Sequence, residues 1–264
     1  MKHFVFLMGS IILLALLAGC MAAQPTATLP PPTDLPPTAP PPTLPPPTAT
    51  NIIPTETQPP TATTAPTNTP LPEGVLFRDD FNGTLQPGWT WEFEDPTKWS
   101  FTDDGSLQII GQSESLLGDE RQKNLLWRDL PEGDFTVTVH IITKPFANFQ
   151  QTAIFLYEDP NNYVTINRGY CDVCPTGGNG FYMDYKTAGA WGDYLFKTEA
   201  TDVYIRLESK GQIISGYYAT QPDDWHRLGR FGNYFAFKKV GLGVSNIHAA
   251  DAVVGQYDWF EISK

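Results

Sequence analysis

The sequence predicts an all-β fold, an antiparallel two-sheet sandwich or jelly roll preceded by a disordered stalk. Three observations lead to this prediction. Residues 73–264 repeatedly place apolar side chains at every second position, which is typical of half-buried strands. Clusters of Gly, Pro, Asn and Asp separate these runs at short intervals. Residues 24–72 contain 18 Pro and 14 Thr among 49 residues, a composition that cannot bury a core.

The first 19 residues have the pattern of an export signal. Lys2 and His3 give a charged start, and the apolar run after them is shorter than the roughly 20 residues of a bilayer-spanning helix. The stretch LAGC at residues 17–20 resembles the lipobox of bacterial lipoproteins. That resemblance implies cleavage after residue 19 and lipidation of Cys20, which places the rest of the chain outside the cytoplasm, anchored to a bacterial cell membrane. The alternative is an uncleaved anchor with an incidental cysteine.

Residues 20–72 are the predicted stalk. From residue 24 onward this segment has no aromatic residue, and its only charged residues are Asp34 and Glu56. Proline at this density favours extended polyproline-II segments of about 3.1 Å per residue, so the stalk reaches on the order of 150 Å when fully extended. The segment is therefore interpreted as a spacer.

Residues 73–264 have a length that suits one domain. They contain 16 basic and 27 acidic residues. This negative charge argues against nucleic acid as a partner and against direct binding to anionic lipids, because both would be repelled. An acidic, exported domain of this kind suits neutral ligands.

Alternation identifies individual strands within the domain. One run, residues 135–142, points its odd-numbered side chains to one face: Phe135, Val137, Val139 and Ile141. A second run, residues 202–209, does the same with Val203, Ile205 and Leu207. The stretches NYVTINR and KVGLGVS behave similarly, and each such strand is expected to bury one face in a core.

Four stretches resemble, in order, the concanavalin A-like domain found as the C-terminal module of family 43 β-xylosidases. They are FRDDFNGTLQPGWTW with WSFTDDGSLQI, AIFLYEDPNNYVTINRG, VYIRLESKGQIISGYYATQPDDWHRLG, and VGLGVSN with GQYDWFEI. The resemblance covers residues 75–262 and implies a jelly roll of this type. It departs from the family in the turn before Trp225, where Ser-x-Asp-Gly is common and this chain has ATQPDD.

Catalytic motifs are missing from the sequence. Glucanases on this kind of scaffold use carboxylates in a pattern like E-x-D-x-x-E, and the nearest match here is Glu92, Glu94 and Asp95, interrupted by Pro96. There is no nucleophile elbow, zincin motif or phosphate loop. No catalytic residue is therefore assigned, and whether the protein is an enzyme stays open, with a non-catalytic role favoured.

A carbohydrate-binding role fits the aromatic content better, because flat rings pack against the apolar faces of sugars. The segment GFYMDYKTAGAWGDY is polar and Gly-rich, and Trp127 and Arg128 lie on a strand expected to be its neighbour. The candidate ligand-binding residues are Trp127, Arg128, Tyr182, Asp184, Lys186 and Trp191. The sequence thus predicts a surface lipoprotein whose module binds a polysaccharide. A glycoside hydrolase or its accessory subunit, and a protein adhesion module, are the alternatives.

The resemblance also implies a structural calcium ion, since such sandwiches often tie their first and last strands together with one. Asp80 and Asp258 are the candidate ligands, with turn hydrogen bonds as the simpler role for Asp80. A melting temperature that is equal in calcium and in chelator would argue against the ion.

Cys171 and Cys174 form a C-x-x-C pair with three alternatives: a disulfide, free thiols or a metal site. A structural zinc ion usually has four Cys or His ligands, and a redox pair usually starts a helix, so an exported all-β chain favours the disulfide. Such a disulfide would pin the loop between NYVTINRGY and GFYMDYK.

Overall fold

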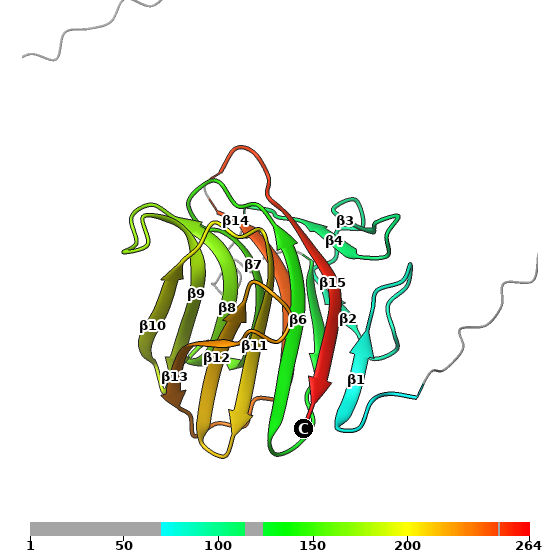
Figure 1. Ribbon diagram of the computed structural model, residues 1–264, viewed down its shortest axis with the longest axis vertical. Helices are drawn as coiled ribbons and strands as arrows, with labels where there is room; N and C mark the ends of the chain where they lie inside the picture. Colours follow the sequence, from blue (N-terminus) through cyan, green and yellow to red (C-terminus); the bar gives the residue numbers. More distant parts are fainter. Residues whose placement is uncertain (1–69, 114–123, 248) are drawn as a thin grey trace, which may run out of the picture. The chain divides into compact units, whose positions relative to one another are not determined.

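The computed structural model describes residues 70–113, 124–247 and 249–264, and the regular structure in this part is entirely β. The strands form two antiparallel sheets that face each other (Figure 1). This confirms the predicted all-β sandwich. The predicted signal peptide, Cys20 and the stalk up to residue 69 lie outside the described residues. No helix in the described part is long and apolar enough to cross a membrane.

The eight-stranded sheet has the order β13-β12-β11-β6-β15-β4-β3, and β1 pairs with the last part of β15. The first strand of the domain thus lies against the last. The strands are β1 (Val75–Asp79), β3 (Trp99–Phe101), β4 (Leu107–Ile110), β6 (Phe135–Thr143), β11 (Asp202–Lys210), β12 (Ile213–Ala219), β13 (His226–Gly232) and β15 (Val254–Ser263).

The seven-stranded sheet has the order β10-β9-β8-β7-β14-β5-β2. Four strands that follow one another in the chain, β7 to β10, also follow one another in this sheet (Figure 1). The strands are β2 (Thr90–Glu92), β5 (Leu125–Asp129), β7 (Gln150–Asp159), β8 (Asn162–Cys171), β9 (Gly178–Thr187), β10 (Ala190–Lys197) and β14 (Lys239–Asn246).

The alternating apolar side chains of the strands meet between the sheets. Phe135, Val137, Val139 and Ile141 of β6 are at most 4% exposed, and the three predicted residues of β11 are fully buried, as expected. Facing them from the other sheet are Ile154, Leu156, Val164 and Ile166. Since strand side chains alternate, the residues between these positions lie on the outer faces of the sheets.

Two buried polar side chains extend through this core. The Tyr257 hydroxyl, carried by β15, lies 2.8 Å from the Gly243 carbonyl oxygen and 2.9 Å from that of Ala153, and it accepts the Gly243 N–H at 3.0 Å. It therefore joins the eight-stranded sheet to β7 and β14. The Arg168 guanidinium donates to the carbonyls of Ala200 (2.6 Å) and Gly169 (2.7 Å).

Cys171 and Cys174 form a disulfide with a Cα–Cα distance of 5.3 Å, which confirms the predicted pairing. The bridge closes the turn between β8 and β9. Thr176, two residues further on, lies 2.6 Å from the Tyr182 hydroxyl, which also donates to the Gly178 carbonyl at 2.5 Å. The turn is thus fixed to β9 at the edge of the predicted ligand-binding segment.

Candidate functional site on the seven-stranded sheet

Strand register brings six outward-facing residues into one line across the seven-stranded sheet. Trp191 lies opposite Lys186, which lies opposite Tyr163 on β8. Tyr163 in turn faces Tyr157, and Lys239 stands between Tyr157 and Asp129. We call this line the cross-strand row; its residues are Asp129, Lys239, Tyr157, Tyr163, Lys186 and Trp191. They come from six consecutive strands, which at about 4.8 Å per strand makes a row of about 24 Å.

Solvent reaches the cross-strand row along its length. Trp191 is 62% exposed, Asp129 and Lys239 are also exposed, and the two tyrosines and Lys186 are partly buried. The neighbours of these residues along the strands, such as Leu156 and Val164, point into the core instead. The row is therefore an accessible stripe of rings and charged groups on a rigid sheet.

A hollow of about 570 Å³ lies at the Asp129 end of the row, over β2, β5 and the ends of β7 and β14. Trp127 forms part of its wall and donates its indole N–H to Glu92 at 2.6 Å. The Trp127 ring packs edge-on against Phe155, at 4.8 Å between centroids. Phe155 lies flat on the bare backbone of Gly241, where a Cβ would be only 2.2 Å from the ring.

Arg128 also lines the hollow, but its guanidinium is held away from the cross-strand row. The guanidinium carbon lies 3.2 Å from the centre of the Phe77 ring, and Nη1 donates to the Pro87 carbonyl at 2.7 Å. Burial is the main cause that lowers the pKa of Arg128. Arg128 thus packs the edge of the sandwich, on the opposite face of β5 from Trp127.

The candidate residues therefore lie at two ends of one face. Trp127 and the β9 residues were expected on neighbouring strands, whereas β8, β7 and β14 separate β5 from β9. Lys186 and Trp191 lie at the β9–β10 end of the cross-strand row, with Asp184 beside them. Tyr182 is 6% exposed, and its hydroxyl is engaged by the disulfide turn.

Two carboxylates face each other next to Trp191 and Lys186. Asp184 on β9 is directly opposite Asp193 on β10, two pairs further along the same ladder and therefore on the same face. Burial, followed by the charge of Asp193, raises the pKa of Asp184 from 3.8 to about 6. Burial, followed by the negative charge of Asp184, raises the pKa of Tyr163. This end of the row is therefore locally negative.

Replacing Asp184 with asparagine is expected to stabilise the fold at pH 7 by about 1 kcal/mol. Because the pKa of Asp184 is raised by folding, the carboxyl is protonated in both states below pH 3.8 and ionises first in the unfolded chain. Stability from this group is lost as the pH rises from about 4 to about 6. Denaturant unfolding at pH 4 and pH 7 checks this prediction. The free energy of unfolding of the variant should exceed that of the parent at pH 7 and hardly differ from it at pH 4. An equal increase at both pH values would contradict the prediction.

Asn167 on β8 lies on the same outer face, between Ala153 and Tyr182 on the flanking strands. It is fully buried, and neither its amide nitrogen nor its amide oxygen has a hydrogen-bond partner in the part of the chain that the structure describes. Unpaired buried amide atoms are costly. Asn167, Asp193, Tyr157, Tyr163 and Lys239 were not predicted from the sequence, although the alternation in NYVTINR already places Tyr163 and Asn167 on the polar face of their strand.

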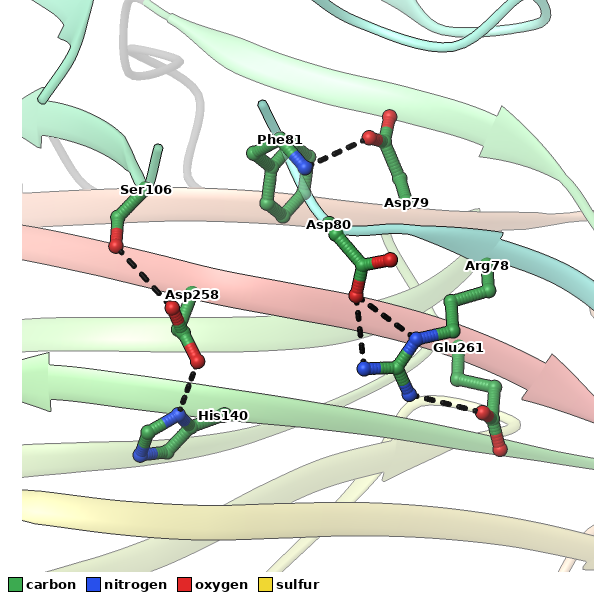
Figure 2. Close-up of polar contacts among 8 residues, drawn as sticks. All are labelled: Arg78, Asp79, Asp80, Phe81, Ser106, His140, Asp258 and Glu261. Atoms are coloured by element: carbon green, nitrogen blue, oxygen red, sulfur yellow. Dashed lines mark hydrogen bonds and ion pairs between the residues drawn. The ribbon is translucent and has the colours of Figure 1, made fainter. Parts of the chain in front are cut away.

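The nominated calcium ligands lie on the other sheet and have protein partners (Figure 2). Asp80 accepts two bonds of 2.8 Å from the Arg78 guanidinium, which also reaches Glu261 at 3.2 Å. Asp258 lies 2.9 Å from Nδ1 of His140 and accepts from Ser106 at 3.4 Å. Within residues 70–113, 124–247 and 249–264, no group of three or more His, Cys, Asp or Glu side chains is arranged to hold a metal ion. The calcium ion stays a prediction.

The acids of the nearest catalytic match support neighbouring groups. Besides Glu92, which accepts from Trp127, Glu94 accepts from the Trp99 indole at 3.1 Å. Asp95 accepts from the backbone N–H of Thr97 (3.1 Å) and from its hydroxyl (2.6 Å). The three carboxylates thus serve separate structural contacts.

Comparisons with known proteins agree with this architecture. The chain matches the model of the β-xylosidase C-terminal concanavalin A-like domain over residues 78–263. A search of curated proteins gave no match. Among solved structures, the GH43 protein BlXynB from Bacillus licheniformis is 21% identical, with a TM-score of 0.63 over 76% of this chain and 41% of that one.

Two further structures share the fold. A xylan β-1,4-xylosidase from Bacillus halodurans is 17% identical, with a TM-score of 0.59 over 77% of this chain and 42% of that one. A β-glucanase from Bacillus licheniformis is 13% identical, with a TM-score of 0.54 over 71% of this chain and 97% of that one. This chain thus spans about two-fifths of the length of the xylosidases. With the family match covering most of the chain, the protein belongs to the family of β-xylosidase C-terminal concanavalin A-like domains.

Proposed function

We propose that this protein is a surface lipoprotein whose sandwich domain binds a polysaccharide without cleaving it. The observation that supports this is the cross-strand row, in which Tyr157, Tyr163 and Trp191 stand on one accessible sheet face. Such rings pack against the apolar faces of sugar rings, and neighbouring polar groups bond the hydroxyls. A row of about 24 Å suits several consecutive units of an extended glycan.

The proposal favours binding over cleavage because the acids of the nearest glucanase-like match have structural roles. Hydrolysis of a glycosidic bond needs a carboxylic acid and a second carboxylate on either side of that bond. Glu92, Glu94 and Asp95 accept hydrogen bonds from separate structural partners. A glycoside hydrolase or its accessory subunit remains the alternative, and release of reducing sugar from any bound polysaccharide distinguishes it.

The anchoring part of the proposal is based on the sequence of residues 1–20. A lipid on Cys20 and the Pro/Thr-rich stalk would hold the domain outside the cell and well above the membrane. Labelled palmitate supplied to the producing cells is expected to appear on the protein and to be absent from a Cys20→Ala variant. An unlabelled parent protein would overturn the anchoring part of the proposal.

A glycan array with the purified protein tests the binding function. A hit is expected to lose affinity at least tenfold in Trp191→Ala and in Tyr163→Ala, because each removes a ring contact of about 1.4 kcal/mol or more. Tyr234→Ala is the matched control, since Tyr234 is 78% exposed but lies in the β13–β14 connection. Glycan binding that survives both row variants, or binding to protein ligands alone, would refute the proposal.

A further inference from the structure

The pair of Asp184 and Asp193 is an unusual feature of an otherwise regular sheet. Carboxylates directly opposite on neighbouring antiparallel strands have Cβ atoms about 4.5–5.5 Å apart, and like charges in this arrangement destabilise the sheet. No Lys or Arg among the described residues forms a salt bridge with either carboxylate. The sheet thus holds an uncompensated negative pair on an accessible face.

Lys186 is the nearest base by position, two residues from Asp184 on the same face of β9. Burial and the charge of Asp193 raise the pKa of Asp184, whereas hydrogen bonds from Asn162 and Asn161, with a smaller effect of the Lys186 charge, lower the pKa of Asp159 at the end of β7. Lys186 forms no salt bridge with either carboxylate of the pair. Within residues 70–113, 124–247 and 249–264, no Lys or Arg is therefore paired with these two carboxylates.

Among the described residues, Asn167 is a second polar group without a partner on the outer face of the sheet, although its amide oxygen lies toward Gly169. It lies opposite Tyr182, the residue two positions before Asp184 on β9. The NH2 group and the oxygen of its fully buried amide have no hydrogen-bond partner in the described part of the chain. A buried amide with both atoms unpaired is rarely retained unless a ligand or an ordered water completes it.

The ring of Trp191 lies next to the acidic pair. Trp191 and Asp193 are two residues apart on β10, so they point to the same side about 7 Å from one another. A sugar ring that packs on the exposed indole would therefore place a ring substituent within reach of the carboxylates.

From this arrangement, and resting on the proposed function, we propose that the polysaccharide carries free amino groups. Its protonated amino sugars would bind with the ammonium group between Asp184 and Asp193 and the ring face on Trp191. The ammonium supplies the positive charge that the pair lacks, and charge-assisted hydrogen bonds of this kind are about twice as strong as neutral ones. The net charge of −12 also draws a polycationic chain toward the protein.

The test compares two ligands that differ at one ring substituent, a protonated amino group in one and a neutral acetamido group in the other. Calorimetry of the purified protein uses a β-1,4-linked glucosamine hexamer and the N-acetylglucosamine hexamer of the same linkage. The glucosamine hexamer is expected to bind at least tenfold more tightly. In the double variant Asp184→Asn, Asp193→Asn this preference is expected to vanish.

A matched variant controls for the general attraction between opposite charges. Asp223→Asn with Asp224→Asn removes the same charge from an exposed turn next to the eight-stranded sheet and should keep the tenfold preference. If both double variants lost the preference for the glucosamine hexamer equally, the preference would come from surface charge in general, and the proposal would be wrong. Thermal melting verifies that the Asp184, Asp193 variant is folded, and it should melt no lower than the parent at neutral pH.

The remaining outcomes separate this inference from the proposed function. If both hexamers, or only neutral glycans, bind and Trp191→Ala abolishes that binding, the row is a glycan site and the amino-sugar inference is wrong. If no glycan binds on an array that includes both hexamers, the proposed function itself fails and the inference with it.

Discussion

Replacing Arg168 with alanine is expected to lower the free energy of unfolding by about 3 kcal/mol or more. Arg168 is 1% exposed on β8, and it holds the Ala200 carbonyl at 2.6 Å and the Gly169 carbonyl at 2.7 Å. Ala200 lies between β10 and β11, where the chain crosses from one sheet to the other. Loss of the side chain therefore leaves a cavity and unpaired carbonyls at this crossing.

The buried charge of Arg168 is costly in free energy, and replacing the side chain with a shorter one is expected to destabilise the fold. Burial, opposed by the charges of Glu199 and Tyr182, lowers the pKa of Arg168 to about 10, so the guanidinium still carries its proton at neutral pH. Arg168→Met fills most of the volume and removes only the hydrogen bonds and the charge, so about half of the loss is expected. Urea unfolding measures both variants, and a midpoint unchanged in Arg168→Ala would contradict the assigned role.

Alternation in the sequence was sufficient to predict the strands that border the core. Residues such as Val139 and Ile205 repeat every second position, and each repeat turned out to be a strand with that face buried. A resemblance spread over four ordered stretches was enough to predict the family. Both kinds of signal are contained in short segments, which is why they can be read without knowing how the segments pair.

The candidate site depended on information that short segments do not contain. Trp191 and Lys186 belong to one hairpin, so the sequence brought them together correctly. The continuation of the line from Tyr157 to Lys239 and Asp129 exists only because β14 inserts between β5 and β7, far from both in sequence. Strand order and register of this long-range kind are set by the packing of the whole sandwich.

Some residues within correctly predicted strands have roles that their charge did not predict. Arg128 follows Trp127, and strict alternation in β5 turns it to the opposite face, against Phe77. Arg168 ends a polar-looking stretch and yet is among the most deeply buried side chains. Charge alone suggests solvent or ligand contact for both, and only the positions of the neighbouring carbonyls and rings explain their burial.

Tyr257→Phe is expected to cost about 2 kcal/mol although it removes a single oxygen atom. The hydroxyl is fully buried, and burial raises the pKa of Tyr257 against the effect of its bonds to Gly243 and Ala153. Those two residues are in β14 and β7, beside Gly241 and Phe155 beneath the centre of the candidate site. Phenylalanine keeps the volume but leaves the Gly243 N–H and the two carbonyls without this partner.

The consequence of Tyr257→Phe should therefore extend beyond global stability. Tyr217→Phe is the matched control, because its hydroxyl donates to Glu208 at 3.2 Å on the partly exposed face of the other sheet, where water replaces it. Urea unfolding should separate the two variants by well over 1 kcal/mol. Amide hydrogen exchange should speed up at β7 and β14 in Tyr257→Phe alone, since the hydroxyl ties those strands to β15. Equal exchange in both variants would mean that the seven-stranded sheet holds the site rigid without help from across the core.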